Sequence, residues 1–215
     1  FMVLNASDFD VPQARERVFF VGFHNGSPSP PDLDSMIIPY KVKAKSVREA
    51  LAVLDKAGEG NNKNLCKARI TLTQNPVLRK SAYAGMLFNG LGRPLKLDGY
   101  SATLPASMGG NKTPIIDENA LYNGKSPWIE DYRDRVEKDS SIAKTEIVPG
   151  YLRRMTVDEA RVIQTFPLEY KFCGSQSAQY TQIGNAVPCN LSKAVCSMVI
   201  DVIKGNAPII YSGLF

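Results

Sequence analysis

A glycine, an asparagine and a proline close together constrain the last part of this chain more than any other feature. Residues 180–188 read Tyr-Thr-Gln-Ile-Gly-Asn-Ala-Val-Pro. Gly184 and Asn185 are typical of a turn, and Pro188 is tolerated in the first turn of a helix but not in its interior. The pattern predicts a turn and then a long helix that ends at Gly205. Apolar residues recur there at helical spacing, namely Leu191, Ala194, Val195, Met198, Val199, Val202 and Ile203.

Two arginines lie at the start of a second constrained segment. Residues 11–23 read Val-Pro-Gln-Ala-Arg-Glu-Arg-Val-Phe-Phe-Val-Gly-Phe. Residues 18–23 predict a strand of a sheet that is buried on both faces. Arg15 and Arg17 are two residues apart on an extended segment, so their guanidinium groups point to the same side. Each guanidinium suits a carboxylate, a phosphate or a carbonyl oxygen. A salt-bridged strand end is the simpler interpretation of such a pair taken alone.

Capping residues predict helices elsewhere in the chain. Two pairs have the spacing of a capping box, Ser46 with Glu49 and Thr156 with Glu159. The first pair predicts a surface helix that ends near Gly58, and the second predicts a helix that stops before Pro167. Pro127 favours another helix over residues 128–136. Residues 1–4 predict a short buried strand, and residues 70–117 predict irregular structure with short strands.

The composition limits the classes of function. The net charge is +5 and the isoelectric point is about 9.0, which fits a nucleic-acid partner but also many other basic domains. His24 is the only histidine, so a histidine-based metal site or a Ser-His-Asp triad is excluded within the chain, and we expect no metal. The four cysteines form no CxxC pair, which indicates a reducing compartment. No run of about 18 apolar residues and no secretion leader are visible, so we expect no membrane span.

The constrained segments, taken in chain order, resemble the last three conserved motifs of the DNA cytosine-5 methyltransferases of bacterial restriction-modification systems. The matching segments are residues 11–23, 153–167 and 180–188. The resemblance implies that Arg17 contacts O2 of an extruded cytosine and that Arg15 organises the site. It also implies that Gly184, Asn185 and Ala186 line the pocket of the cofactor S-adenosylmethionine. The middle segment supports DNA reading rather than chemistry.

Two positions depart from the family's pattern. The family usually places an arginine three residues after the glutamate of the middle motif, whereas Arg161 comes two after Glu159, so we assign it no role. Cys189 replaces a frequent second proline, and Pro188-Cys189 therefore imitates the Pro-Cys pair of the family's nucleophile. That nucleophile follows a Gly-rich cofactor strand, whereas Cys189 lies in the first turn of the predicted helix. We interpret Cys189 as a small packing residue.

The variable region between the motifs, roughly residues 37–150, is the position of the family's target-recognition domain. That domain usually contains a threonine followed by an aliphatic residue, which contact the backbone of the flipped nucleotide, and Thr103 with Leu104 fits this description. Arg93, Asn111 and Lys112 lie beside flexible glycines and have side chains that suit base edges in the major groove. We expect these three to contact bases, with phosphate contact or a plain turn as the alternative.

The resemblance covers only the C-terminal half of an ordinary family member. In the family a cysteine thiolate adds to C6 of the flipped base and C5 then takes the methyl group. The Gly-rich cofactor loop, the Pro-Cys nucleophile and the glutamate that this chemistry requires are not identifiable in these residues. We therefore predict a DNA (cytosine-5-)-methyltransferase as the complete protein, and no methyl transfer by this chain alone. The missing N-terminal half is part of the same chain or a separate subunit.

Two other interpretations remain open at this stage. A non-catalytic DNA-binding relic is the first, although such a relic has no need of Arg17 and Asn185. An RNA cytosine-5 methyltransferase of the same fold is the second, although the long Gly-rich middle favours duplex DNA. The sequence does not reveal the DNA target.

The expected fold class is α/β, with the C-terminal part of a Rossmann-like S-adenosylmethionine-dependent domain and a smaller, irregular recognition domain. Residues 1–36 are expected to end the catalytic domain, residues 37–170 to form the recognition domain, and residues 171–215 to return to the catalytic domain. The Pro- and Ser-rich residues 25–31 are a candidate boundary. Duplex DNA is expected between the two domains, in the bacterial cytoplasm at the nucleoid.

Overall fold

The computed structural model describes residues 1–26 and 32–206 of the 215-residue chain. Most of the candidate boundary at residues 25–31 lies outside the described residues, as do residues 207–215. Short helices and strands alternate in the order β1 (Met2–Asn5), η1 (Ala6–Asp8), β2 (Gln13–Ala14), β3 (Glu16–Phe19), α1 (Leu33–Ile37), η2 (Ile38–Tyr40), α2 (Val47–Leu51), β4 (Leu72–Val77), β5 (Met86–Phe88), β6 (Ser101–Ala102), β7 (Ile115–Asp117), α3 (Glu118–Asn123), α4 (Trp128–Lys138), α5 (Ile142–Thr145), β8 (Leu152–Arg154), α6 (Val157–Ile163), α7 (Gln176–Asn185) and α8 (Cys189–Ile203).

Each sheet in the described part of the chain has two strands. The pairs β1–β3, β4–β5 and β7–β8 are antiparallel, and β2–β6 is parallel. In β1–β3, Met2 pairs with Phe19 and Leu4 pairs with Arg17. Met2 and Leu4 are buried, whereas Val18 is 52% exposed. The predicted strand over residues 18–23, buried on both faces, is therefore wrong, because β3 ends at Phe19 and one face of the pair is open.

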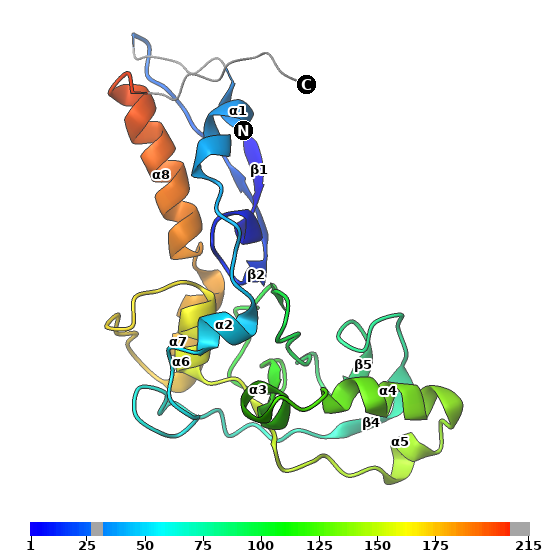
Figure 1. Ribbon diagram of the computed structural model, residues 1–215. Coiled ribbons are helices and arrows are strands. Elements are labelled where there is room, and N and C mark those ends of the chain that lie inside the picture. Colours follow the sequence, from blue (N-terminus) through cyan, green and yellow to red (C-terminus); the bar gives the residue numbers. More distant parts are fainter. Residues whose placement is uncertain (27–31, 207–215) are drawn as a thin grey trace.

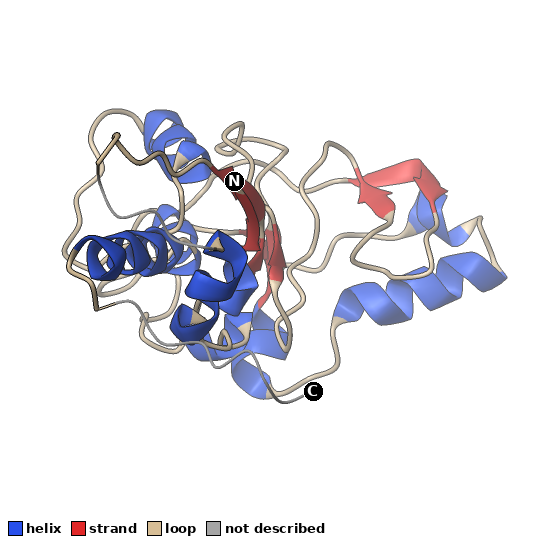
Figure 2. Ribbon diagram, turned by 90° about the horizontal axis from the view of Figure 1, so that it is seen from above, coloured by secondary structure: helices blue, strands red, loops and turns tan. Residues whose placement is uncertain are grey.

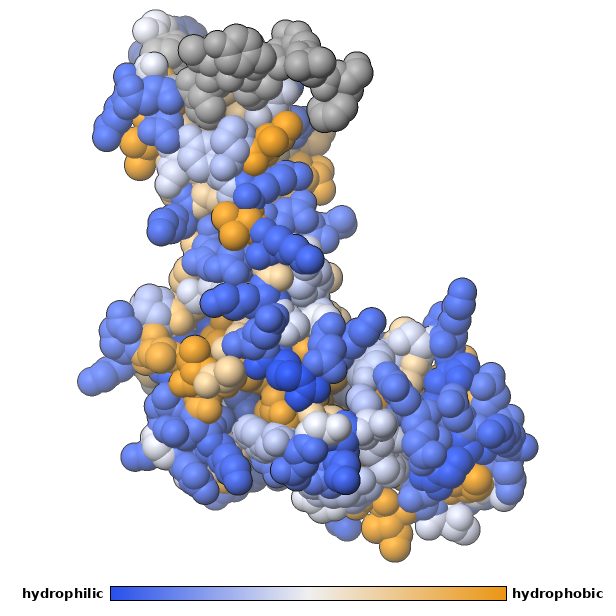
Figure 3. Space-filling model, in the orientation of Figure 1, coloured by the Kyte–Doolittle hydropathy of each residue, from blue (hydrophilic) through white to orange (hydrophobic). Residues whose placement is uncertain are grey.

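Three hydrophobic cores divide the described residues into three packed bodies (Figure 1). The terminal body consists of β1, β3, α1 and α8, and the central body contains α2, α6 and α7. The hairpin body consists of β4, β5, α4 and α5, and Figure 2 shows it projecting to one side of the others. The pair β7–β8 lies between two bodies, since Ile115 packs in the hairpin core and Ile116 in the central core. Hydrophilic residues cover most of the hairpin body, while apolar side chains gather over the central body (Figure 3).

The helix predictions from capping residues are confirmed. Both predicted capping boxes form, at the starts of α2 and α6, and α6 ends before Pro167. The first helix is shorter than predicted, because α2 ends at Leu51 rather than near Gly58. Pro127 is the N-cap of α4, as its position indicated.

The segment around Gly184 forms the end of a helix instead of the predicted turn. Gly184 and Asn185 belong to α7, and Pro188 is the N-cap of α8, which is followed by Gly205 with a φ of +69°. Residues 176–203 together have the length and composition of a membrane span. The break after Asn185 divides them into helices of 10 and 15 residues, each shorter than the roughly 20 residues that a span requires.

The packing changes body at this same break. Tyr180 and Ile183 of α7 lie in the central core, whereas Leu191 and Met198 of α8 lie in the terminal core. The division at residues 170 and 171 that the sequence predicts remains a prediction, but the cores of the described residues divide the chain after Asn185.

Candidate nucleic-acid and cofactor site

Arg15 joins three segments that are far apart in the sequence. Its side chain is buried, and Nη1 donates to the carbonyl oxygen of Leu104 at 3.2 Å. Nη2 donates to the carbonyl oxygens of Gly184 at 2.8 Å and Ala186 at 3.1 Å. Burial first, and then the nearby positive charge of Arg17, lower the pKa of Arg15 to about 10, so the group stays protonated at neutral pH. Arg15 thus acts as a charged brace between β2, the Thr103 segment and the end of α7.

Arg17 lies on the same face of the strand as Arg15, as predicted. Along this segment Gln13 and Arg15 are buried and Arg17 is half-buried, while the alternate residues Ala14 and Glu16 are exposed. Arg17 donates through Nη1 to the carbonyl oxygen of its neighbour Glu16 at 2.6 Å. The half-buried guanidinium of Arg17 therefore has donors available for a substrate beside the brace that Arg15 forms.

The predicted cofactor residues lie at the break between α7 and α8. Gly184 packs so tightly that an added Cβ atom would lie 2.6 Å from backbone atoms of Ala106. This close approach explains why a residue without a side chain is required at position 184. Asn185 is exposed at the last position of α7. The carbonyl oxygen of Ala186 accepts from Arg15 at 3.1 Å and from Gln164 at 3.4 Å. The backbone is thus firmly held beside an exposed carboxamide, and the role of these three residues in binding the cofactor stays a prediction.

A basic cavity brings together three of the predicted DNA-contacting residues. It has a volume of about 660 Å³ and is lined by Thr103, Arg93 and Lys112. Arg79 and Lys96 add two further cations, and none of the described residues that line it is acidic. Such a concave, cationic surface suits the phosphate backbone of a nucleic acid. Arg79 and Lys96 belong to no sequence motif, because only the tertiary fold brings them to this cavity.

Individual side chains modify the predicted contacts. Leu104 is 1% exposed and packs in the central core, so its side chain does not face the cavity. Thr103 is exposed and donates its hydroxyl to the carbonyl oxygen of Ala14 at 3.0 Å. Arg93 donates through Nη1 to the carbonyl oxygens of residues 84 and 85, which secures the turn before β5. Asn111 is exposed but does not line the cavity.

Cys189 has the environment of a packing residue. It is half-buried at the start of α8, where its amide donates to the carbonyl oxygen of Gln164 at 3.2 Å. Burial raises the pKa of the Cys189 thiol. A raised pKa disfavours the thiolate, which is the nucleophilic form. The geometry therefore supports the exclusion of Cys189 as the nucleophile.

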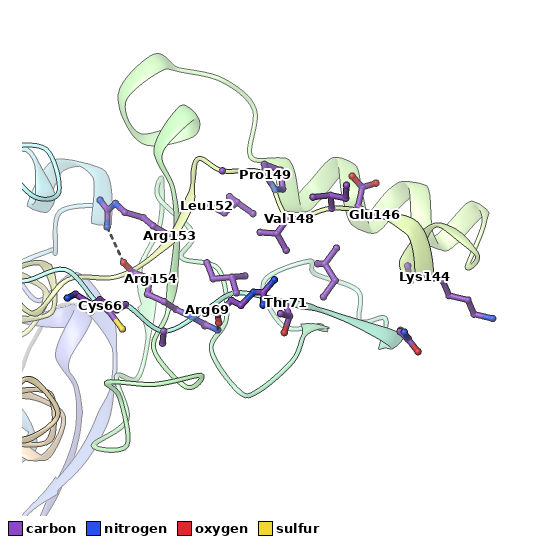
Figure 4. Close-up of a pocket in the computed structure, with 18 residues that line it drawn as sticks. Cys66, Arg69, Thr71, Lys144, Glu146, Val148, Pro149, Leu152, Arg153 and Arg154 are labelled. Atoms are coloured by element: carbon purple, nitrogen blue, oxygen red, sulfur yellow. Dashed lines mark hydrogen bonds between the residues drawn. The ribbon is translucent and has the colours of Figure 1, made fainter.

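A second basic cavity, of about 610 Å³, lies between residues 66–74 and 143–154 (Figure 4). One of its arginines, Arg153, forms two ion pairs, through Nη2 with Glu159 Oε1 at 2.6 Å and through Nε with Glu118 Oε1 at 2.7 Å. Burial lowers the pKa of Arg153, but the bonds to the two carboxylates more than offset this, so its pKa lies above the usual range. Arg161 pairs with Asp158 instead, which agrees with its displaced position in the motif.

Comparison with known proteins identifies the family of this chain. Residues 1–201 match the family described as C-5 cytosine-specific DNA methylase, so the chain belongs to that family. Among the relatives, the Type II methyltransferase M.DdeI from Desulfomicrobium norvegicum is 27% identical over 92% of this chain and 53% of its own length. M.Eco47II from Escherichia coli is 30% identical over 94% of this chain and 45% of its own length. The chain therefore spans about half the length of the curated relatives it matches.

Two further comparisons differ in extent. A segment of 54 residues, 25% of this chain and 12% of the relative, is 54% identical to the Type II methyltransferase M.Bpa9945I from Bacillus paralicheniformis. The crystal structure of the Dnmt2 methyltransferase of S. pombe aligns with 95% of this chain and 56% of its own, at 15% identity and a TM-score of 0.49. Family membership assigns the chain to the S-adenosylmethionine-dependent methyltransferases, whose C-5 DNA members use that cofactor as methyl donor.

Proposed function

We propose that this chain is the C-terminal, DNA-recognising portion of a DNA cytosine-5 methyltransferase. The observation that carries the proposal is the brace formed by Arg15. Its bonds to Leu104, Gly184 and Ala186 hold the Thr103 segment and the predicted cofactor segment next to the strand of Arg17. The segments that we predict to contact DNA, the base and the cofactor therefore lie around a single buried guanidinium.

The basic cavity supports the proposal that this portion binds duplex DNA. Thr103 and Lys112 engage the backbone around the target nucleotide, because phosphate oxygens are the groups that hydroxyls and cations contact most. In the proposed complex Arg93, from the cavity, and Asn111, from the surface outside it, contact base edges, where an arginine suits guanine and an asparagine suits adenine. The two unpredicted cations, Arg79 and Lys96, extend the surface for the phosphates.

The target cytosine leaves the stack and lies beside Arg17. The guanidinium of Arg17 donates to O2 of the base, which orients the ring and favours the electron-rich form of that oxygen. Asn185, with the backbone of Gly184 and Ala186, forms one wall of the cofactor pocket. S-adenosylmethionine, when bound there, supplies the methyl group for C5.

The partner of this chain is the other half of the enzyme, in the same polypeptide or in a second subunit. The outer face of β1–β3 supports this proposal, because it exposes a cluster of large apolar side chains. Phe1 is 75% and Phe20 is 84% exposed, and the centroids of their rings are 6.1 Å apart. Val3 and Val18, which pair with each other, lie beside them on the same face. The other half covers this face and contributes the nucleophile, in the bacterial cytoplasm beside the nucleoid.

Methyl transfer from radiolabelled S-adenosylmethionine to duplex DNA tests the proposal. The chain together with the remaining half should label DNA, whereas the chain alone should not. Arg17→Ala should lower kcat about 100-fold or more, as the loss of a transition-state donor does. Arg17→Lys keeps the charge and lacks the planar fork, so it should restore little of that loss.

The alternatives give different results in the same assay. If the chain binds DNA and no assembly containing it transfers methyl groups, the chain is a DNA-binding relic and the proposal fails. If transfer RNA accepts methyl groups and duplex DNA does not, the substrate class is wrong. Label incorporated by the purified chain alone would contradict the division of labour between the two halves.

A further inference from the structure

Two buried glutamines connect the predicted DNA segment to the predicted cofactor segment. Gln13 and Gln164 are both 0% exposed at the junction of the terminal and central bodies. A buried amide is costly unless its hydrogen bonds are made. Apolar side chains of similar size can fill the same space, so the choice of two amides points to a directional role.

The bonds of the two side chains form one continuous path. The amide of Leu104 donates to Gln13 Oε1 at 3.0 Å, and Gln13 Nε2 donates to Gln164 Oε1 at 3.2 Å. Gln164 Nε2 in turn donates to the carbonyl oxygen of Ile183 at 2.7 Å and, more weakly, to that of Ala186 at 3.4 Å. The path runs from Leu104, the residue after Thr103, to Ile183 and Ala186, between which Gly184 and Asn185 lie.

Strained backbone surrounds the same junction. Asp10 and Thr165 have φ values of 53° and 57°, and they are the two non-glycine residues with a positive φ in the described part of the chain. Both are restrained by Asn190, whose amide donates to Thr165 Oγ1 at 3.0 Å and whose Nδ2 donates to the carbonyl oxygen of Asp10 at 3.1 Å. Such conformations persist only where the surroundings fix them, and they are typical of functional sites.

We propose that Gln13 and Gln164 are positioning residues that couple the binding of DNA to the binding of the cofactor. The inference rests on the proposed function and adds a mechanism to it. A displacement of the backbone beside Asn185 moves the carbonyl oxygens that Gln164 binds, and Gln13 passes the movement to Leu104 and Thr103. DNA on the Thr103 side therefore stabilises the arrangement that the cofactor requires, and the reverse holds by linkage.

Equilibrium binding to the complete methyltransferase, this chain with its other half, tests the coupling. S-adenosylhomocysteine and a duplex oligonucleotide serve as probes, each titrated alone and with the other at saturation. The wild type should bind each probe at least about fivefold more tightly when the other is present, and the two factors should be equal. Gln164→Leu should reduce both factors to about one.

Two variants separate coupling from simple stability. Gln176 also donates one side-chain bond to a backbone carbonyl, that of Leu65 at 2.7 Å, but it lies at the other end of α7. Gln176→Leu should leave the coupling factor unchanged. Combining Gln13→Leu with Gln164→Leu should have no larger effect than either alone, because both act on one path. If Gln164→Leu does not fold, Gln164→Met replaces it as the test variant, because methionine is similar in size to glutamine and has no donor for the carbonyl oxygen of Ile183.

The outcomes are distinct from those of the proposed function. A wild-type enzyme that methylates DNA but shows no coupling overturns the inference and leaves the proposed function intact. Full coupling in folded Gln164→Leu, or an equal loss in Gln176→Leu, also overturns the inference. An assembly that binds DNA but never S-adenosylhomocysteine overturns both.

Discussion

The terminal body and the hairpin body contrast in how completely each covers its own apolar residues. In the hairpin body, α4 turns Ile129, Tyr132 and Val136 into the core, and its outer side carries ion pairs such as that of Arg133 with Glu137. In the terminal body, α8 covers one face of β1–β3 and the other face exposes Phe1 and Phe20. The hairpin body is therefore closed around its own core, whereas the terminal body leaves an apolar face that we propose the other half of the enzyme covers.

The largest expected effect is on stability, and it tests whether the core of the hairpin body is closed without the other half of the enzyme. Ile129→Ala removes a side chain that is 4% exposed, so it should lower the free energy of unfolding of the hairpin body by about 2–5 kcal/mol. Urea denaturation followed by the fluorescence of Trp128, which stacks on Tyr132, reports on this core. A loss below about 0.5 kcal/mol, typical of surface positions, would show that the core is not closed.

The next effect concerns the open face of the terminal body. Phe20→Ser should change the free energy of unfolding of the isolated chain by no more than about 0.5 kcal/mol. It should weaken association with the other half about tenfold to hundredfold, since burial of a phenylalanine contributes about 1.5–3 kcal/mol. Ile147→Ser is a matched control, because Ile147 is 81% exposed beside the hairpin body. Affinity for the other half is measured by calorimetry or analytical centrifugation. An equal loss of affinity in both variants would contradict the assignment of the outer face of β1–β3 as the contact surface.

A smaller effect separates base reading from phosphate contact on the DNA side. Arg93→Ala should cost about 1–3 kcal/mol on the preferred sequence and relax the preference at one position. Lys112→Ala should weaken binding evenly on all sequences and reduce the salt slope by about 1. Lys138→Ala, at the exposed end of α4, is the control. Uniform weakening by Arg93→Ala in fluorescence anisotropy would show that Arg93 contacts phosphate rather than a base.

The smallest effect sharpens the role of α8 within the terminal body. Tyr40 donates its hydroxyl to Asp201 Oδ2 at 2.6 Å, and burial first and then this carboxylate raise the pKa of Tyr40 to about 12. The folded pKa lies above the usual value of about 10, so the stabilisation is complete below pH 10 and is lost as pH rises through about 12. Tyr40→Phe should lower the free energy of unfolding by roughly 0.5–1.5 kcal/mol at pH 8. Between pH 8 and pH 12, this variant should lose less of its stability than the wild type does. If urea denaturation shows that the stability of the variant and of the wild type falls equally between pH 8 and pH 12, this contribution is disproved.

Local patterns predicted local structure well. The capping boxes of α2 and α6 and the start of α8 at Pro188 depend on neighbours within a few residues, so the sequence was sufficient. The expected turn at Gly184 was wrong because the glycine is required by the close approach of Ala106, a contact that no local pattern contains.

The candidate site was predictable in part for the same reason. The strand motif correctly placed Arg15 and Arg17 on one face, and three of the expected DNA residues line one cavity. Leu104 was expected to contact the nucleotide backbone together with Thr103, but its side chain is buried, because a threonine-aliphatic pair does not specify which side chain faces the core. Arg79 and Lys96 carry no motif at all, and they were missed because only the fold brings them to Thr103.

The core of the terminal body joins residues from opposite ends of the chain, since Met2 and Leu4 pack with Leu191 and Met198. During translation, β1 and β3 leave the ribosome long before α8, the helix that covers one face of this pair, has been made. At about 5–20 residues per second, the intervening segment takes on the order of ten seconds or more to synthesise. The hairpin body is complete within that interval. The face of the β1–β3 pair that α8 covers therefore stays without that cover until α8 has been made.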